Sequence, residues 1–509
     1  MKHLVKLAKG ARVESKIPTI LKEILEKKAT KKILQKAREV PLNVPNLDKN
    51  LIIAEIKRAS PSAGKIGEIK EPYALAQSYL KGGADAISVL CEEDYFKGSL
   101  SDLESVKVKN PNAVVLRKDF ITKIEQVKEA YEYGADMILL IAAVFVNGEN
   151  GGFARLESLY KECLKLGLTP LVEVHNEEEI EFIVPLNASL VGINSRNLHN
   201  FKINKIKAYN LLDSIKAKSV IFESSLNSSF DAFIVGNLGF SGILCGSYLV
   251  KSKNPQFALS GLKEALKSGQ TSQNTFYKNA FKLLESKLGL IKICGINCIK
   301  SLEIAQNELL RLKSNAKAVG AEKIAALGFI LDSASPRFLS DFEFLKKVDS
   351  KFLKVAVVRD NKEQLMRGIS LYKSGLIDAL QLHGISSEIF GGVDLREANF
   401  PFYAVLNIEN ASDFKKESLA ISPFVLLDSK SPQGGGSGKS IDLKQLEKIK
   451  EKLGESPLCI AGGVGCENLA EFKKLGAKML DFNSKLESTT ALKDAKKTKT
   501  AIDEILKSS

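Results

Sequence analysis

Charged side chains stand at the ends of short apolar runs in the first half of the chain. Glu55 and Lys57 are two residues apart after such a run, while Lys118 and Glu173 end two later ones. A positioned acid or base contributes about 10²–10⁴ in rate, and a buried charge is costly unless it is used or paired. If the fold brings these ends together, they predict one polar active site, with the candidates Glu55, Lys57, Ser60, Lys118, Glu173, Asn194, Arg196, Glu223 and Ser224.

The second half offers a different set of reactive groups. Cys294 stands directly before a glycine at the end of an apolar run, where a thiol could act as a base or nucleophile, and Asp428 ends another run. Cys298 follows four residues later, but the chain has only four histidines and no second pair at ligand spacing, so we expect no metal. Arg337 follows a further apolar run.

A glycine-rich segment, PQGGGSGKS (432–440), follows Asp428. It is not a nucleotide-binding P-loop, because Gln433 occupies the position of the first required glycine. A glycine-rich turn between a strand and a helix still directs backbone N–H groups at an anion. We therefore predict a phosphate site that includes Gly435, Gly436 and Ser437.

Apolar β-branched runs alternate with amphipathic helical stretches throughout the chain. Eight such strand–helix units in about 250 residues predict a (β/α)₈ barrel, and each half of the chain contains eight. A doubly wound sheet is the rival fold, but it gives no reason for eight units in each half. The predicted strands are 51–56, 86–90, 113–118, 137–144, 170–174, 190–195, 220–224 and 242–247, then 291–295, 324–331, 353–358, 379–382, 402–408, 424–429, 458–463 and 479–483.

The bulk properties agree with two soluble domains in 509 residues. We place one domain at 1–265, with a helical extension before its first strand, a connector at 266–288 and the second domain at 289–509. The net charge of +14 raises the question of nucleic acid, but lysines are interleaved with glutamates and form no run with aromatics, so none is expected. No apolar run is long enough for a membrane helix, so no membrane contact is expected. The seven cysteines are an odd number and form no C-x-x-C pair, which predicts a reducing cytoplasm.

The first domain resembles indole-3-glycerol phosphate synthase in AEIKRASPSAG (54–64), VLCEEDYFKGSLSDL (89–103), VLRKDF (115–120), PLVEVHNEEE (170–179) and VGINSRNL (191–198). The resemblance implies that the first domain closes an indole ring with loss of CO₂ and water. It makes Lys118 the general acid, tuned by Glu55 and Lys57, and Glu173 the general base. Lys57 would neutralise the leaving carboxylate, and the residues that orient substrate would be Glu55, Asn194 and Ser224. The phosphate would bind near Gly246 and Ser247, where Ser225 replaces the glycine usual in the family.

The second domain resembles phosphoribosylanthranilate isomerase in KICGI (292–296), SPR (335–337), QLHG (381–384), LLDS (426–429), GGGSGK (434–439) and IAGGV (460–464). The resemblance implies an Amadori rearrangement with Asp428 as the acid, Cys294 as the base and Arg337 holding the acidic substrate. The phosphate would bind the glycine-rich segment together with Gly462, Gly463 and Ser484. Lys485 stands where the family commonly has glycine, and His383 is expected to be structural.

Together the resemblances predict a bifunctional enzyme of tryptophan biosynthesis that catalyses consecutive steps on small phosphorylated anthranilate sugars. We expect a monomer without a cofactor. The alternative is that one barrel has weakened activity, because Ser225 and Lys485 alter the expected phosphate loops. The competing readings are another pair of sugar-phosphate barrels, or a basic nucleic-acid binder or scaffold with one inactive barrel.

Overall fold

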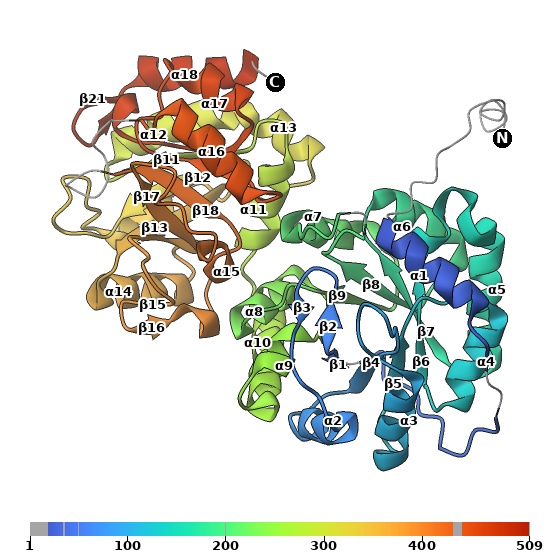
Figure 1. The fold of residues 1–509 in the computed structure, drawn as a ribbon. Coiled ribbons are helices and arrows are strands. Elements are labelled where there is room, and N and C mark those ends of the chain that lie inside the picture. The colour runs from blue at the N-terminus through green and yellow to red at the C-terminus, as the bar shows by residue number, and fades with distance from the viewer. Residues whose placement is uncertain (1–18, 34–35, 49, 199, 431–439, 508–509) are drawn as a thin grey trace, which may run out of the picture.

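The computed structural model describes residues 19–33, 36–48, 50–198, 200–430 and 440–507. The first half forms a closed barrel of eight parallel strands (Figure 1). Every residue of its first strand is buried, because side chains fill the ring on one face and helices cover the other. The strands are β1 (Leu51–Ile56), β4 (Ala86–Leu90), β5 (Val115–Lys118), β6 (Met137–Ile141), β7 (Thr169–Val174), β8 (Leu190–Asn194), β9 (Ser219–Glu223) and β10 (Gly242–Cys245).

The second half closes a second ring of eight parallel strands. Strand β11 pairs with both the next strand and the last one, which completes the circle. The fold of two tandem (β/α)₈ barrels is therefore confirmed. The strands are β11 (Leu290–Cys294), β12 (Ala325–Ile330), β13 (Phe352–Arg359), β14 (Ala379–His383), β17 (Phe402–Ile408), β18 (Val425–Ser429), β19 (Leu458–Ile460) and β20 (Ala477–Phe482).

Some strands are shorter than the apolar runs that predicted them. Strand β6 ends at Ile141, and the next three residues form the 3₁₀ turn η1 (Ala142–Val144). Strand β19 ends at Ile460, because Gly462 and Gly463 take φ values of 70° and 62°, which interrupt extended backbone. Both shortenings turn the chain at the carboxyl end of a strand, where the barrel forms its site.

Helices surround both rings. Those of the first barrel are α2 (Pro72–Lys81), α3 (Leu100–Lys109), α4 (Ile124–Glu132), α5 (Gly152–Lys165), α6 (Glu177–Ile183), α7 (Lys205–Asn210), α8 (Ser229–Leu238), α9 (Ser247–Lys251) and α10 (Pro255–Thr271). Those of the second are α12 (Ile299–Leu309), α13 (Lys313–Ala318), α14 (Lys362–Lys373), α15 (Ser418–Ile421), α16 (Leu443–Leu453), α17 (Leu469–Lys474) and α18 (Ala495–Lys507). None of the helices in the described ranges has the length and apolarity needed to span a membrane.

The segment before the first barrel is helical only in part. Helix α1 (Thr19–Thr30) packs Leu21 and Ile24 against the barrel, and Lys28 forms an ion pair with Asp119 beside the barrel mouth. The described residues from 31 to 48 are not helical, which corrects the expectation of a helical extension, and Pro41 fits this because it cannot donate a helix hydrogen bond. The extension therefore contacts a loop that belongs to the site.

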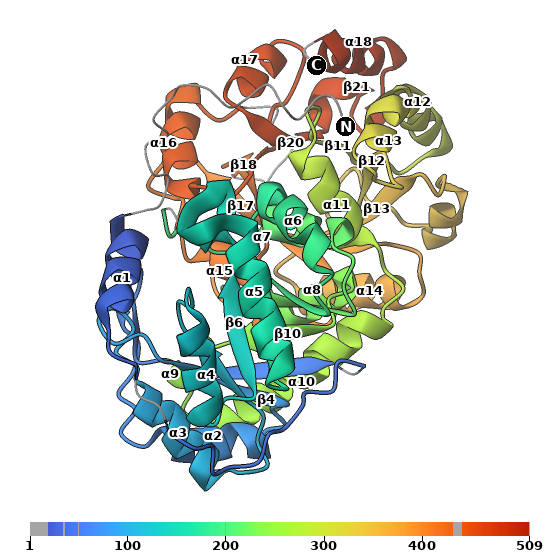
Figure 2. The same cartoon turned by 90° about the vertical axis from the view of Figure 1, so that its right-hand side faces the viewer.

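A buried helix, α11 (Phe276–Glu285), joins the two barrels (Figures 1 and 2). Phe281 stacks on Tyr209 of the first barrel at 5.2 Å between ring centroids and meets Phe424 of the second at 6.5 Å. The hydroxyl of Tyr277 donates to the carbonyl oxygen of Phe402 at 2.9 Å. Because each buried aromatic side chain contributes about 1.5–3 kcal/mol, this helix holds the barrels together as an apolar interface.

Candidate active sites

The predicted residues of the first half lie around one cavity. It has a volume of about 1110 Å³ and opens at the carboxyl ends of the strands. The residues come from six different strands or the loops that follow them, which only ring closure could bring together. The lining includes Glu55, Lys57, Ser60, Lys118, Glu173, Asn194, Arg196, Glu223, Ser224, Gly246 and Ser247.

Lys118 lies between two carboxylates at the centre of this cavity. Its ammonium nitrogen is 3.0 Å from Oε2 of Glu173 and also contacts Oε2 of Glu223. Burial alone would lower the pKa of Lys118, but the charges of Glu173 and Glu223 raise it above its usual range. Glu55 also raises the pKa of Lys118, although less than Glu173 and Glu223 do, and Lys57 pairs with Glu55 at 2.5 Å.

The two carboxylates around Lys118 have different ionisation. Burial would raise the pKa of Glu173, yet Lys118 and His175 together hold it well below its usual range. Burial raises the pKa of Glu223 to about 8, and Lys118 only partly opposes it. At neutral pH the site therefore contains an ionised Glu173, a protonated Glu223 and a charged lysine between them.

A glycine on the neighbouring strand makes room for Glu223. A Cβ atom at Gly192 would lie 2.0 Å from Oε1 of Glu223, far inside contact distance. This oxygen is buried and has no hydrogen-bond partner within the described ranges of the chain. Gly192 thus allows the carboxyl group to sit against the sheet with one oxygen on Lys118.

Sequence reasoning missed His175 as a site residue. Its Nδ1 is 2.9 Å from Oε2 of Glu179, and its Nε2 is 3.3 Å from Oε1 of Glu173. Burial opposes the charge on the ring, but Glu179 and Glu173 raise the pKa of His175 to about 10. The signal was present, because His175 follows Glu173 by two residues at the end of β7, and residues so spaced share a face of a strand.

The expected phosphate end of the first cavity has unusual backbone. Ser224 and Ser225 take φ values of 70° and 57°, the left-handed region that favours glycine. The hydroxyls of Ser225 and Ser195 are 2.8 Å apart, so the serine that replaces the family's glycine keeps this turn and adds a hydrogen bond. At the next strand, a Cβ at Gly246 would lie 2.4 Å from Oε2 of Glu55, which explains the glycine there.

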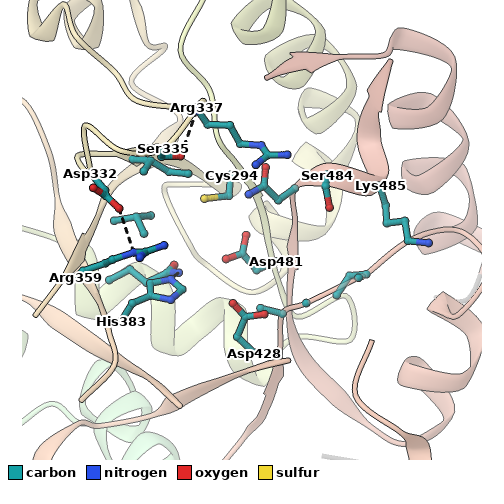
Figure 3. Close-up of a pocket in the computed structure, with 18 residues that line it drawn as sticks. Cys294, Asp332, Ser335, Arg337, Arg359, His383, Asp428, Asp481, Ser484 and Lys485 are labelled. Carbon is teal, nitrogen blue, oxygen red and sulfur yellow. Dashed lines mark hydrogen bonds and ion pairs between the residues drawn. The ribbon is translucent and has the colours of Figure 1, made fainter. Parts of the chain in front are cut away.

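The second barrel has a cavity of about 790 Å³ at the carboxyl ends of its strands (Figure 3). Its lining includes Cys294, Arg337, Asp428, Gly462, Gly463 and Ser484 from the predicted set. Gly435, Gly436 and Ser437 lie outside the described residues. A Cβ at Gly462 would lie 2.6 Å from Oδ1 of Asp428, so this glycine lets the chain pass directly over the carboxylate.

Two of the basic residues that line the second cavity, Arg337 and Lys485, are each paired with a carboxylate. Arg337 makes a bidentate contact with Glu487, in which both nitrogen–oxygen distances are 2.8 Å. Lys485 lies 2.6 Å from Oε1 of Glu467. The sequence predicted Arg337 as a substrate-binding group and did not reveal the pairing, because Glu487 is 150 residues away.

Several further charged groups face the second cavity. Asp481 lines it, as do Asp332 and Arg359, which form an ion pair at 3.1 Å. Burial, then the charge of Asp481, raises the pKa of Asp428 to about 6. Burial also raises the pKa of Cys294, and burial lowers that of His383 to about 3. The neutral His383 accords with the structural role expected for it.

Two closed barrels, each with a charged cavity at the carboxyl ends of its strands, define a double (β/α)₈-barrel enzyme. Residues 9–262 match the family model for indole-3-glycerol phosphate synthase, and residues 305–504 match that for N-(5'phosphoribosyl)anthranilate (PRA) isomerase. The chain belongs to the indole-3-glycerol phosphate synthase family through its first barrel and carries a PRA isomerase domain as its second. It is a bifunctional enzyme of tryptophan biosynthesis, a carboxy-lyase followed by an isomerase.

Similar proteins share either one barrel or both. Indole-3-glycerol phosphate synthase 1 of Streptomyces coelicolor is 40% identical over 215 residues, which are 42% of this chain and 77% of that protein. The tryptophan biosynthesis protein TrpCF of Helicobacter pylori strain 26695 is 29% identical over 503 residues, 95% of this chain and 98% of that protein. TrpCF of strain J99 is 28% identical over 497 residues, with the same two shares. Both family models match, and the comparisons give no support to weakened activity in one barrel.

Proposed function

We propose that the second barrel converts N-(5-phosphoribosyl)anthranilate to 1-(2-carboxyphenylamino)-1-deoxyribulose 5-phosphate, with Asp428 as the acid and Cys294 as the base. Opening the ribose ring needs a proton at the ring oxygen, and a carboxyl group with a pKa of about 6 retains part of its protons near neutrality. The thiolate of Cys294 then removes the C2 proton. The position of both side chains around one cavity supports these roles (Figure 3).

The first barrel would convert that product to indole-3-glycerol phosphate through Lys118 and Glu173. Lys118 donates a proton to the ketone oxygen during ring closure, and ionised Glu173 accepts a proton during dehydration. Lys57 neutralises the carboxylate that leaves as CO₂, while Glu55, Asn194 and Ser224 orient the substrate. The observation that carries this proposal is the charged Lys118 held at 3.0 Å from Glu173 inside the cavity.

The remaining predicted residues would bind the rest of each substrate. In the first barrel the phosphate would meet backbone near Gly246 and Ser247, with Ser60, Arg196 and Glu223 around the other polar groups. In the second, the phosphate would meet Gly462, Gly463 and Ser484 beside the glycine-rich segment. Arg337 would approach the anthranilate carboxylate, and its bidentate contact with Glu487 fixes the direction of the guanidinium.

We also propose that the protein acts as a monomer in the cytoplasm, without a cofactor. The fusion of both barrels in one chain supports the monomer. All seven cysteines are free, which accords with a reducing compartment. Acid and base groups suffice for both proposed reactions.

A two-stage fluorescence assay tests the residue roles. The chain contains no tryptophan, so indole product and anthranilate can be followed without indole background from the enzyme. Lys118→Ala should stop indole formation and leave isomerisation intact, whereas Cys294→Ala should stop isomerisation and leave the synthase active on supplied ketose. Each variant is the matched control for the other. Isomerisation that survives Cys294→Ala would show that the base is a different group.

A further inference from the structure

A buried ion pair lies under the reactive groups of the second barrel. Lys292 is completely buried, and its ammonium nitrogen is 2.7 Å from Oδ2 of Asp481 on the neighbouring strand β20. The same nitrogen contacts Oε1 of Gln381, which also accepts a hydrogen bond from the hydroxyl of Tyr403 at 2.6 Å. Such a pair is costly in desolvation and adds little net stability, so its presence in the barrel interior calls for another role.

Lys292 lies close to the sulfur of Cys294. The two residues are two apart on β11 and therefore share the inner face of the strand. A Cβ placed on Gly328 of β12 would be 2.7 Å from Sγ of Cys294 and 2.8 Å from Cε of Lys292. Because Sγ of Cys294 and Cε of Lys292 both lie this close to the same Cβ position, the two atoms are at most about 5.5 Å apart. Gly328 leaves the space that lets the charged chain approach the thiol.

Asp481 lies on the other side of the pair, toward Asp428. Its Oδ1 atom is buried and has no hydrogen-bond partner in the part of the chain that the structure describes, and the residue lines the same cavity as Asp428. Figure 3 shows Asp481 between Cys294 and Asp428. Each charge reaches both reactive groups: at Asp428 the effect of Asp481 exceeds the opposing effect of Lys292, and at Cys294 the effect of Lys292 exceeds the opposing effect of Asp481.

We propose that the Lys292–Asp481 pair sets the protonation states of both reactive groups, with Lys292 favouring the thiolate of Cys294 and Asp481 favouring the protonated form of Asp428. Both are positioning residues that act through their neighbours. The inference rests on the proposed roles of Cys294 and Asp428. It gives the pair a function that its stability contribution does not explain.

The pair matters because the reactive groups are needed in the less common forms. The pKa of Cys294 lies above its usual value and that of Asp428 is about 6, so near neutrality most molecules have a thiol and a carboxylate. Only the minority with a thiolate and a carboxylic acid can start the reaction. Each unit by which the two pKa values move apart reduces this minority about tenfold, since one pKa unit is a factor of ten in protonation.

Other charged groups near the two residues set the background against which the pair acts. Lys493 and Arg337 face Cys294 from the loops after β20 and β12, and Tyr403 faces it from β17. Lys493 and Arg337 are both paired with Glu487, which reduces their effect on the thiol. Around Asp428 the cavity is lined further by Asp332, Arg359 and His383. Among the charged groups around Cys294, Lys292 opposes the effect of burial most strongly.

The test uses Lys292→Met, Asp481→Asn and the double variant in the full chain. A unit charge at about 5 Å shifts a neighbouring pKa by about two units at an effective dielectric constant of about 20. Lys292→Met should move the upper limb of the isomerase pH profile up by about two units and lower its maximum about 100-fold. Asp481→Asn should move the lower limb down and also lower the maximum. Damage to packing is not expected to make the bell-shaped pH profile of the isomerase both wider and lower.

Two controls keep the outcome interpretable. Lys107→Met removes the matching buried pair of the first barrel, in which Lys107 lies 2.7 Å from Asp136, and should reduce stability without moving the isomerase profile. The double variant removes both charges together, so it remains folded if an unpaired charge destabilises either single variant. Synthase turnover in the same sample reports the concentration of folded first barrel, and urea unfolding of each variant reports whether the second barrel is folded.

Alkylation of Cys294 separates this inference from the catalytic roles. Its rate with iodoacetamide, followed against pH by mass spectrometry of the Cys294 peptide, should shift upward by about two pH units in Lys292→Met. Unmoved alkylation and activity profiles in folded variants would overturn the inference. If alkylation shifts while Cys294→Ala still isomerises, the charge effect is real and the assignment of the base is wrong.

Discussion

Two glycines allow each active site to be disturbed separately within one chain. A Cβ at Gly192 would lie 2.0 Å from Oε1 of Glu223, and Cβ contacts below 3.0 Å essentially do not occur. In Gly192→Ala the buried carboxyl group of Glu223 must therefore move by about 1 Å or more, which disrupts its contact with Lys118. Overpacking of this kind costs about 1–3 kcal/mol in stability, and a 1 Å displacement in a site costs about 10²-fold in rate. We expect synthase kcat/KM to fall about 100-fold.

The reciprocal variant is Gly328→Ala, whose Cβ would lie 2.7 Å from Sγ of Cys294. It should reduce isomerase kcat/KM by a similar factor and leave the synthase unchanged, as Gly192→Ala should leave the isomerase unchanged. Both half-reactions are measured on each purified variant, so the unaffected barrel reports concentration and folding. A folded Gly192→Ala with synthase kcat/KM within threefold of the parent would refute the claim that the position of Glu223 matters to the reaction.

Two further predictions concern stability. The pKa of Asp428 is about 6 in the folded protein, because of burial and then Asp481, and about 3.9 in an unfolded chain, so its favourable contribution exists below pH 4 and is lost as the pH rises through 6. Asp428→Asn should thus abolish isomerisation but raise the free energy of unfolding by about 3 kcal/mol more at pH 8 than at pH 4, measured with urea. Phe281→Ala should cost about 3–5 kcal/mol and make both activities fail together on heating. Phe257→Ala, where the side chain is 72% exposed, is its control, and survival of one activity would show that the barrels unfold independently.

The fold could be predicted because its signals are local. Each buried parallel strand is a short apolar run, and sixteen such runs in two sets of eight leave little choice of architecture. The polar residues at strand ends followed from the same logic, since the carboxyl ends of all strands meet at one rim. Strand ends were less accurate where an apolar run continued into a turn, as at η1 after β6.

The pairing of charges could not be read from the sequence. Lys118 and Glu223 are 105 residues apart, and Arg337 and Glu487 are 150 apart, so only the closed ring decides which residues meet. Lys292 does carry a sequence signal, because it is a lysine inside an otherwise apolar strand, LIKIC, and a buried charge needs a partner. What the sequence leaves undetermined is the choice of Asp481 as that partner.

The relative placement of the barrels decides how the intermediate travels. A cleft of about 1440 Å³ separates them, and on the first barrel it is lined by residues after β8 and β9, including Phe201 and Ser225, which also line the synthase cavity. On the second barrel the cleft is lined by residues 419–423 and 451–457, which precede β18 and β19. The synthase rim therefore faces the amino ends of the isomerase strands, whereas the isomerase cavity opens at their carboxyl ends. The two cavities share no lining residue, so we expect a ketose released by the isomerase to reach the synthase through solvent.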